Sequence, residues 1–118
     1  MAHSGEKRVH TLGMKLEQHR AVRHRFVARV DVVDIESEKQ IVARTSNLSV
    51  FGCFIETDSP LPRGTKIRMR ITHRGAIFAA LGQVSNSRLA GMGVQFVNIE
   101  PAQQQILENW LAQLRSGE

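Results

Sequence analysis

The chain has few of the features that define secreted, disulfide-bonded or membrane-spanning proteins. Cys53 is the only cysteine among 118 residues, which excludes an internal disulfide and a cysteine-rich zinc site. The longest apolar run, residues 76–81, is far too short to span a bilayer. The first ten residues are polar and basic and contain no apolar segment of a secretory signal. We therefore expect a cytoplasmic protein without membrane insertion.

Catalytic motifs are missing as well. The sequence has no phosphate loop ending in Lys-Ser/Thr, no HExxH and no Gly-x-Ser-x-Gly turn. Its five histidines lack metal-ligand spacing; His19 and His24 lie five residues apart without a carboxylate companion. Cys53 follows a glycine in an apolar run, which favours a small core residue over a nucleophile. We predict that the protein is not an enzyme and holds no metal or cofactor.

Aromatic residues are scarce and positive charge is unevenly placed. Five Phe, one Trp and no Tyr alternate like core residues, which argues against an open stacking platform for single-stranded nucleic acid. The net charge is +5, and residues 1–25 hold six Lys/Arg against two acids. We expect a flexible basic arm over residues 1–18 and one domain over 19–118. The arm is either a solvated tail or a collector of anionic ligands.

Hydrophobic periodicity predicts the fold class. Six or so short strands, spaced 8–14 residues apart, alternate between apolar and polar side chains from Phe26 onward. In residues 65–72, for example, Ile, Met and Ile alternate with Lys and Arg. The pattern changes at Pro101, where an i, i+4 apolar stripe predicts a helix. We predict an all-β protein, an antiparallel barrel over about 26–98 with a C-terminal helix over about 101–115, the stripe closing one barrel end.

The stretch RTSNLSVFGCFIET, residues 44–57, interrupts the strand pattern. Asn47, Ser49 and Gly52 are poor or middling strand formers between good ones. One interpretation is a turn in which an Asn or Ser side chain caps the strand and Gly supplies a positive φ. The other is a binding site: on an extended strand Asn47 and Ser49 point to one side and offer donors and acceptors to a flat heteroaromatic edge. Gly52, without a Cβ, lets a ligand ring or a tight backbone bend approach closely.

Arginines crowd the entry to the first strand, in HRAVRHRF at residues 19–26. Arg20, Arg23 and Arg25 can bind phosphate as a fork and stack on aromatic planes. Together with the polar, glycine-containing strand end, they meet the needs of a guanine nucleotide with phosphates.

These residues resemble the PilZ domain, the bacterial receptor module for cyclic di-GMP. The family has two motifs, Arg-x-x-x-Arg and Asp/Asn-x-Ser-x-x-Gly, and the second is complete here from Asn47 to Gly52. The similarity continues through LPRGTKIRMRI, GQVSN and GMGVQFVNIEP to the terminal helix, over about residues 17–115. It implies a six-stranded antiparallel PilZ-type β-barrel with a C-terminal helix.

The first motif departs from the family pattern. Arg25 matches the second arginine, but Ala21 stands four residues earlier with Arg20 beside it. A match at Arg25 and Arg29 has the right spacing but would lie inside the first strand. We rank it lower.

The resemblance implies a role for each site residue. Arg20 and Arg25 would grip phosphates and the Hoogsteen edge of guanine, with Arg23 as an extra phosphate contact. Asn47 and Ser49 would hydrogen-bond a guanine, and Gly52 would leave room for it. The ligand would be cyclic di-GMP, and ordering of the arm would signal to an unidentified protein effector.

Two alternatives to this receptor remain open. One is a PilZ-like protein-interaction module that has lost the nucleotide, which the intact second motif argues against and Ala21 favours. The other is a small basic barrel that binds nucleic acid, which we do not expect. We expect a monomer or weak dimer.

Overall fold

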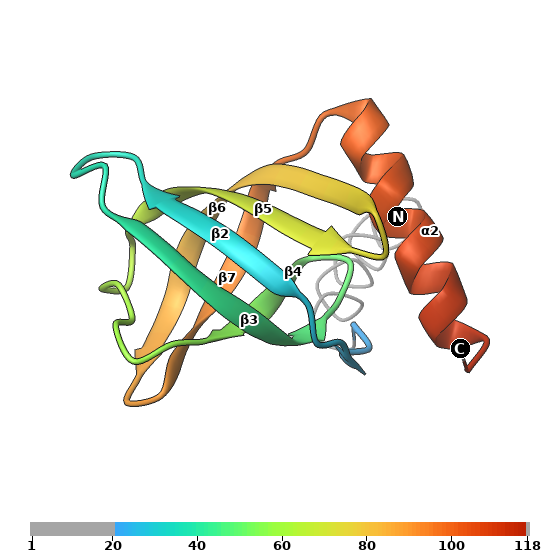
Figure 1. Ribbon diagram of the computed structural model, residues 1–118, viewed down its shortest axis with the longest axis horizontal. Coiled ribbons are helices and arrows are strands. Elements are labelled where there is room, and N and C mark those ends of the chain that lie inside the picture. Colours follow the sequence, from blue (N-terminus) through green and yellow to red (C-terminus); the bar gives the residue numbers. More distant parts are fainter. Residues whose placement is uncertain (1–20, 118) are drawn as a thin grey trace, which may run out of the picture.

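Seven antiparallel strands and one helix make up residues 21–117, the part of the chain that the computed structural model describes. Six strands pair in the order β3-β2-β5-β6-β7-β4, and β3 also pairs with β4, so that the sheet closes into a barrel (Figure 1). This confirms the predicted fold class. The elements are β1 (His24–Arg25), β2 (Arg29–Asp34), β3 (Gln40–Leu48), β4 (Gly52–Glu56), β5 (Lys66–His73), β6 (Ala76–Arg88), β7 (Gly91–Asn98) and α2 (Pro101–Arg115).

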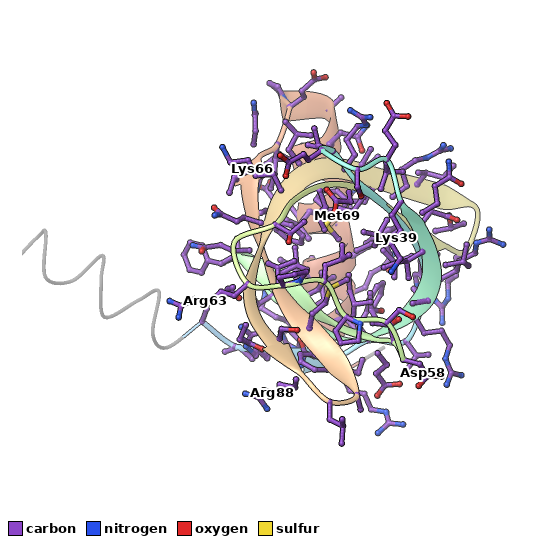
Figure 2. The ribbon with its side chains drawn as sticks, turned by 90° about the vertical axis from the view of Figure 1, so that its left-hand side faces the viewer. Lys39, Asp58, Arg63, Lys66, Met69 and Arg88 are labelled. Atoms are coloured by element: carbon purple, nitrogen blue, oxygen red, sulfur yellow. The ribbon has the colours of Figure 1, made fainter. Side chains whose placement is uncertain are left out.

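Alternate side chains of each strand fill the interior of the barrel and cover its outer surface. On β5, Ile67, Met69 and Ile71 are at most 1% exposed, and Figure 2, which looks into the barrel from one end, shows Met69 inside the ring of strands. Lys66, Arg68 and Arg70, which alternate with these buried residues, are exposed. Successive side chains of a strand point to opposite faces, so this one segment supplies both core and surface, as its pattern predicts.

Helix α2 lies across one end of the barrel (Figure 1). Pro101 occupies its first turn, where a missing N–H costs nothing. Leu107, Trp110 and Leu111 are buried against the barrel. The Trp110 ring lies 5.4 Å from the Phe26 ring and 6.1 Å from that of Phe78, centroid to centroid. The apolar stripe of the helix therefore belongs to the core.

The helix also covers an open strand edge. β6 is thirteen residues long, but its pairing with β7 begins only at Leu81, so the edge of its first five residues has no strand partner there. Ala79 N donates a hydrogen bond of 2.7 Å to Gln103 Oε1 of the helix. This side chain replaces a ladder partner and protects the edge from pairing with another chain.

The start of the first strand differs from its prediction. The alternation begins at Phe26, but β2 begins at Arg29, and the two-residue strand β1 precedes it. β1 pairs with the end of β3 that extends beyond β2. A two-residue strand is too short to show a periodicity of its own, so sequence patterning merges it with the next strand.

Replacing Leu107, which is fully buried, should show how strongly α2 stabilises the barrel. We expect Leu107→Ala to lower the free energy of unfolding by about 2–5 kcal/mol, because the deleted atoms leave a cavity. The matched control is Leu89→Ala at a residue 97% exposed, which should change it by less than about 0.5 kcal/mol. Equal effects in urea unfolding would contradict the packing of α2 on the barrel.

The aromatic contacts of His73 predict a pH dependence of stability. Its ring lies 4.6 Å from that of Phe26 and 5.6 Å from that of Trp110. Burial, and secondarily Arg74, lower its pKa from 6.5. The unfolded chain therefore binds the proton more readily, and stability falls as the pH drops below about 6.5. We expect melting temperatures at pH 7.5 and 5.5 to differ more for the wild type than for His73→Phe, and an equal difference would refute this.

Candidate functional site

The predicted site residues gather where β3 ends, at the barrel end that α2 also covers (Figure 1). Arg25 lies on β1, Asn47 on β3, Ser49 in the following turn and Gly52 at the start of β4, while Arg23 immediately precedes β1. Arg20 lies outside the described residues.

Arg23 and Arg25 lie next to Asn47, the first residue of the Asn-x-Ser-x-x-Gly motif. β1 pairs with β3 in a register that sets Arg25 directly opposite Asn47. Arg23 reaches the same residue, because its Nη1 donates a 3.1 Å hydrogen bond to Asn47 Oδ1. Both arginine side chains are exposed. The structure thus brings two predicted cations to one amide.

The Asn47 side chain is held in a defined orientation. Its Oδ1 also accepts a hydrogen bond of 3.1 Å from Phe54 N on β4. That backbone donor requires the oxygen to face β4, which fixes the assignment of the amide. No hydrogen bond among residues 21–117 uses Asn47 Nδ2. Two fixed donors therefore remain available to a ligand with acceptor groups.

Ser49 lies just past the end of β3, so it is not on the extended strand that carries Asn47, as the binding-site interpretation assumed. β3 ends at Leu48, and its register with β4 shifts between Thr45 and Asn47. Ser49 is 2% exposed, and its Oγ accepts hydrogen bonds from Phe51 N at 3.2 Å and Gly52 N at 3.3 Å. The hydroxyl therefore stabilises the turn, as the alternative interpretation of this stretch expects.

The structure shows a close backbone approach at Gly52, and not the positive φ that the turn interpretation expects. Its φ is not in the left-handed region, unlike that of Gly64 or Gly75. A Cβ at Gly52 would instead collide with the Val94 carbonyl oxygen of β7. The glycine thus permits the close approach of β4 and β7, which closes the barrel beside the turn.

A hollow of about 250 Å³ opens beside this turn. It is smaller than pockets that enclose a drug-sized ligand, roughly 300–1,000 Å³, so it would admit only part of a larger molecule. Three predicted site residues line it, Arg23, Ser49 and Gly52. The rest of the lining comes from the segment before β1, the motif turn, β6 and β7: Ala21, Phe51, Ser85, Val94 and Gln95.

Thr45 is a site-forming residue that the sequence interpretation missed. It is fully buried, and its Oγ1 donates to Phe26 O at 2.6 Å and accepts from Ala28 N at 3.0 Å. It thereby ties the segment between β1 and β2 to β3 and positions Arg25. A polar residue in the inward series Ile41, Ala43, Thr45 was the available signal.

Cys53 lies in the core behind the site. It is fully buried, and burial raises the pKa of its thiol to about 12 although the positive charge of Arg23 acts in the opposite direction. The thiol is neutral at physiological pH, and thiolate is the reactive form. This agrees with the predicted core role. Within residues 21–117, no three His, Cys, Asp or Glu side chains form a metal-binding group, and no helix could span a membrane.

Comparison with known proteins assigns the family. The PilZ domain family matches residues 17–113, most of the chain, and the chain therefore belongs to the PilZ domain family. None of the curated proteins compared with the chain matches it.

Solved structures share the fold at low sequence identity. The PilZ domain of CeSA from a cellulose-synthesizing bacterium superposes with a TM-score of 0.67 and 14% identity, over 80% of this chain and 98% of that one. The PilZ domain of YcgR from Escherichia coli, solved with c-di-GMP, gives 0.65 and 13%, over 82% and 91%. MotI from Bacillus subtilis, an inhibitor of motility, gives 0.64 and 19%, over 83% of this chain and 52% of that one.

The Thr45 hydroxyl should contribute measurably to stability. Thr45→Val keeps the shape but leaves two buried backbone groups, Phe26 O and Ala28 N, without their partner. We expect a loss of roughly 1–3 kcal/mol in the free energy of unfolding. Thr45→Ser should restore most of it, and the control Thr72→Val, at a partly exposed position, should change little. An unaltered urea midpoint for Thr45→Val would contradict the assigned role.

Proposed function

We propose that this protein is a bacterial receptor for cyclic di-GMP, held between the N-terminal arginines and the Asn47–Gly52 motif. One observation carries the proposal: Arg23 bonds to Asn47 while Arg25 pairs opposite it, and Arg23 also lines the hollow beside the motif turn. This supports a single binding site built from two segments that are separated in sequence.

The chemistry of these groups suits a guanine nucleotide. Exposed guanidinium groups bind phosphate oxygens as a fork and can also stack on a base. The Nδ2 donors of Asn47, which no hydrogen bond among residues 21–117 uses, suit the O6 and N7 acceptors of guanine. A cyclic dinucleotide offers both kinds of group at once. The structure of the YcgR PilZ domain with c-di-GMP supports this ligand by likeness of fold.

The proposed role differs from one site residue to the next. Arg25 and Arg20 would bind phosphates and the Hoogsteen edge of guanine, with Arg23 as a further phosphate ligand. The hydroxyl of Ser49 is already bonded within its turn. Its main contribution is therefore to hold the turn, and Gly52 keeps the strands beside it close.

The proposal includes a way to signal that the ligand is bound. Arginines that bind a dinucleotide order the preceding arm over it, and the ordered arm presents a surface to a protein effector. The module is then a cytoplasmic regulator rather than an enzyme.

A second candidate is a PilZ-like protein-interaction module that does not bind the nucleotide. The observation that favours it is Ala21, which lines the hollow where the family pattern has an arginine. A missing guanidinium removes a forked phosphate contact. The two candidates differ in whether the dinucleotide binds at all.

Single substitutions should separate these candidates. We expect Arg25→Ala and Asn47→Ala each to weaken cyclic di-GMP binding about 10- to 100-fold, because each removes hydrogen bonds to a charged or polar ligand worth about 1.5–3 kcal/mol. Isothermal titration calorimetry measures this. The control Arg63→Ala, also exposed but before β5, should retain wild-type affinity.

Two results would overturn the proposal. Wild-type affinity in both site variants would place the nucleotide elsewhere, and no binding by the folded wild type would favour the interaction module.

A further inference from the structure

A row of cations runs along the outer face of β5, away from the proposed nucleotide site. Lys66, Arg68 and Arg70 are exposed and alternate with buried residues. On a strand, residues two apart lie roughly 6.7 Å from each other on one face. β5 pairs with β2 on one side and β6 on the other, so its backbone is not open to strand addition and only its side chains face outward.

The neighbours of this row leave its charge largely uncompensated. The sheet register places Val33 and Leu81 beside Arg68, and Asp31 and Ala79 beside Arg70. The carboxylate of Asp31 is already bound by Arg29, at 3.0 and 3.3 Å. Within residues 21–117, that contact is the one ion pair.

Beside the row, the barrel wall is hollowed toward the start of α2. The hollow has a volume of about 650 Å³. Its apolar lining includes Val33, Ala79 and Leu81, and Arg68 and Arg70 of the row line it as well, whereas Lys66 does not. Asp31, which Arg29 binds, also lines the hollow, together with Asn98, Glu100 and Gln103 near the start of α2. Arginine beside an apolar, concave surface is the composition found at the centres of protein–protein interfaces.

We infer that this face docks an acidic amphipathic helix of a partner protein, with a line of carboxylates on Lys66, Arg68 and Arg70 and apolar side chains in the hollow. The spacing agrees: residues four apart on a helix lie about 6 Å from each other along the axis. A lipid surface is a poorer match because a flat layer of headgroups does not reach into a hollow. A nucleic acid backbone offers nothing to an apolar lining.

The test uses the full chain and a labelled helical peptide of about 18 residues, long enough to form helix in isolation. The peptide carries three glutamates spaced i, i+4, i+8 with leucines beside them. A second peptide has the same composition with the glutamates spread around the helix. Fluorescence anisotropy should show that the first peptide binds at least about fivefold more tightly than the second.

A charge-reversal variant tests the row itself. Arg68→Glu/Arg70→Glu should weaken binding of the first peptide at least about tenfold, because it replaces two attractions with two repulsions. Arg63→Glu/Arg88→Glu makes the same change in net charge at two other exposed residues and should weaken binding less than threefold. Figure 2 shows Lys66 and Arg88 at opposite sides of the barrel end. If the reversal variant does not fold, as judged by its melting temperature, Arg68→Gln/Arg70→Gln replaces it.

Three results would overturn the inference. Equal binding of the two peptides would mean that net charge alone attracts them. An equal loss of peptide affinity in the two charge-reversal variants would also mean attraction by net charge alone. Binding of phosphatidylserine vesicles or duplex DNA that depends on Arg68 and Arg70, without peptide binding, would assign the face to a membrane or a nucleic acid. Titration of the same variants with cyclic di-GMP tests the proposed nucleotide site separately, so that the two proposals can fail independently of each other.

Discussion

The rest of the structure depends on strand β3, which changes its neighbouring strand along its length. It pairs first with β2, and beyond the register shift between Thr45 and Asn47 its end lies between β1 and β4. Thr45 holds this exchange together, since its buried hydroxyl bonds to Phe26 and Ala28. This anchor supports the pairing of β1 with β3, which sets Arg25 opposite Asn47. Barrel closure and the proposed binding site therefore rest on the same few hydrogen bonds.

The barrel also separates two chemically different surfaces. The end near β1 concentrates exposed guanidinium groups around a fixed amide, which suits a compact anion with base edges. The outer face of β5 instead spaces its cations evenly beside an apolar hollow, which suits an extended partner. The proposed nucleotide site and the proposed docking face therefore occupy different parts of one small barrel.

Much of the fold follows from the sequence because it is encoded locally. The alternation of β5 and the i, i+4 stripe around Leu107 and Trp110 each arise within a few turns or residues. The site was predicted less completely, because its geometry is set by contacts between distant segments. Gly52 is fixed by Val94, and Ser49 serves its own turn. Neither contact leaves a periodic signal. Thr45 does leave one, as a polar residue in an inward-facing series, but the partners of its hydroxyl, Phe26 O and Ala28 N, lie 19 and 17 residues away in the sequence.

In the proposed site the Asn47 amide, which β4 orients, recognises a guanine. Nuclear magnetic resonance of the 15N-labelled full chain tests this recognition, by titration with cyclic di-GMP and with GTP as control. We expect large shifts for the Asn47 side-chain NH2 pair and for the Phe54 backbone amide that bonds to Asn47 Oδ1, with contacts from the NH2 to guanine. Shifts confined to other parts of the barrel, or none at saturating dinucleotide, would contradict it.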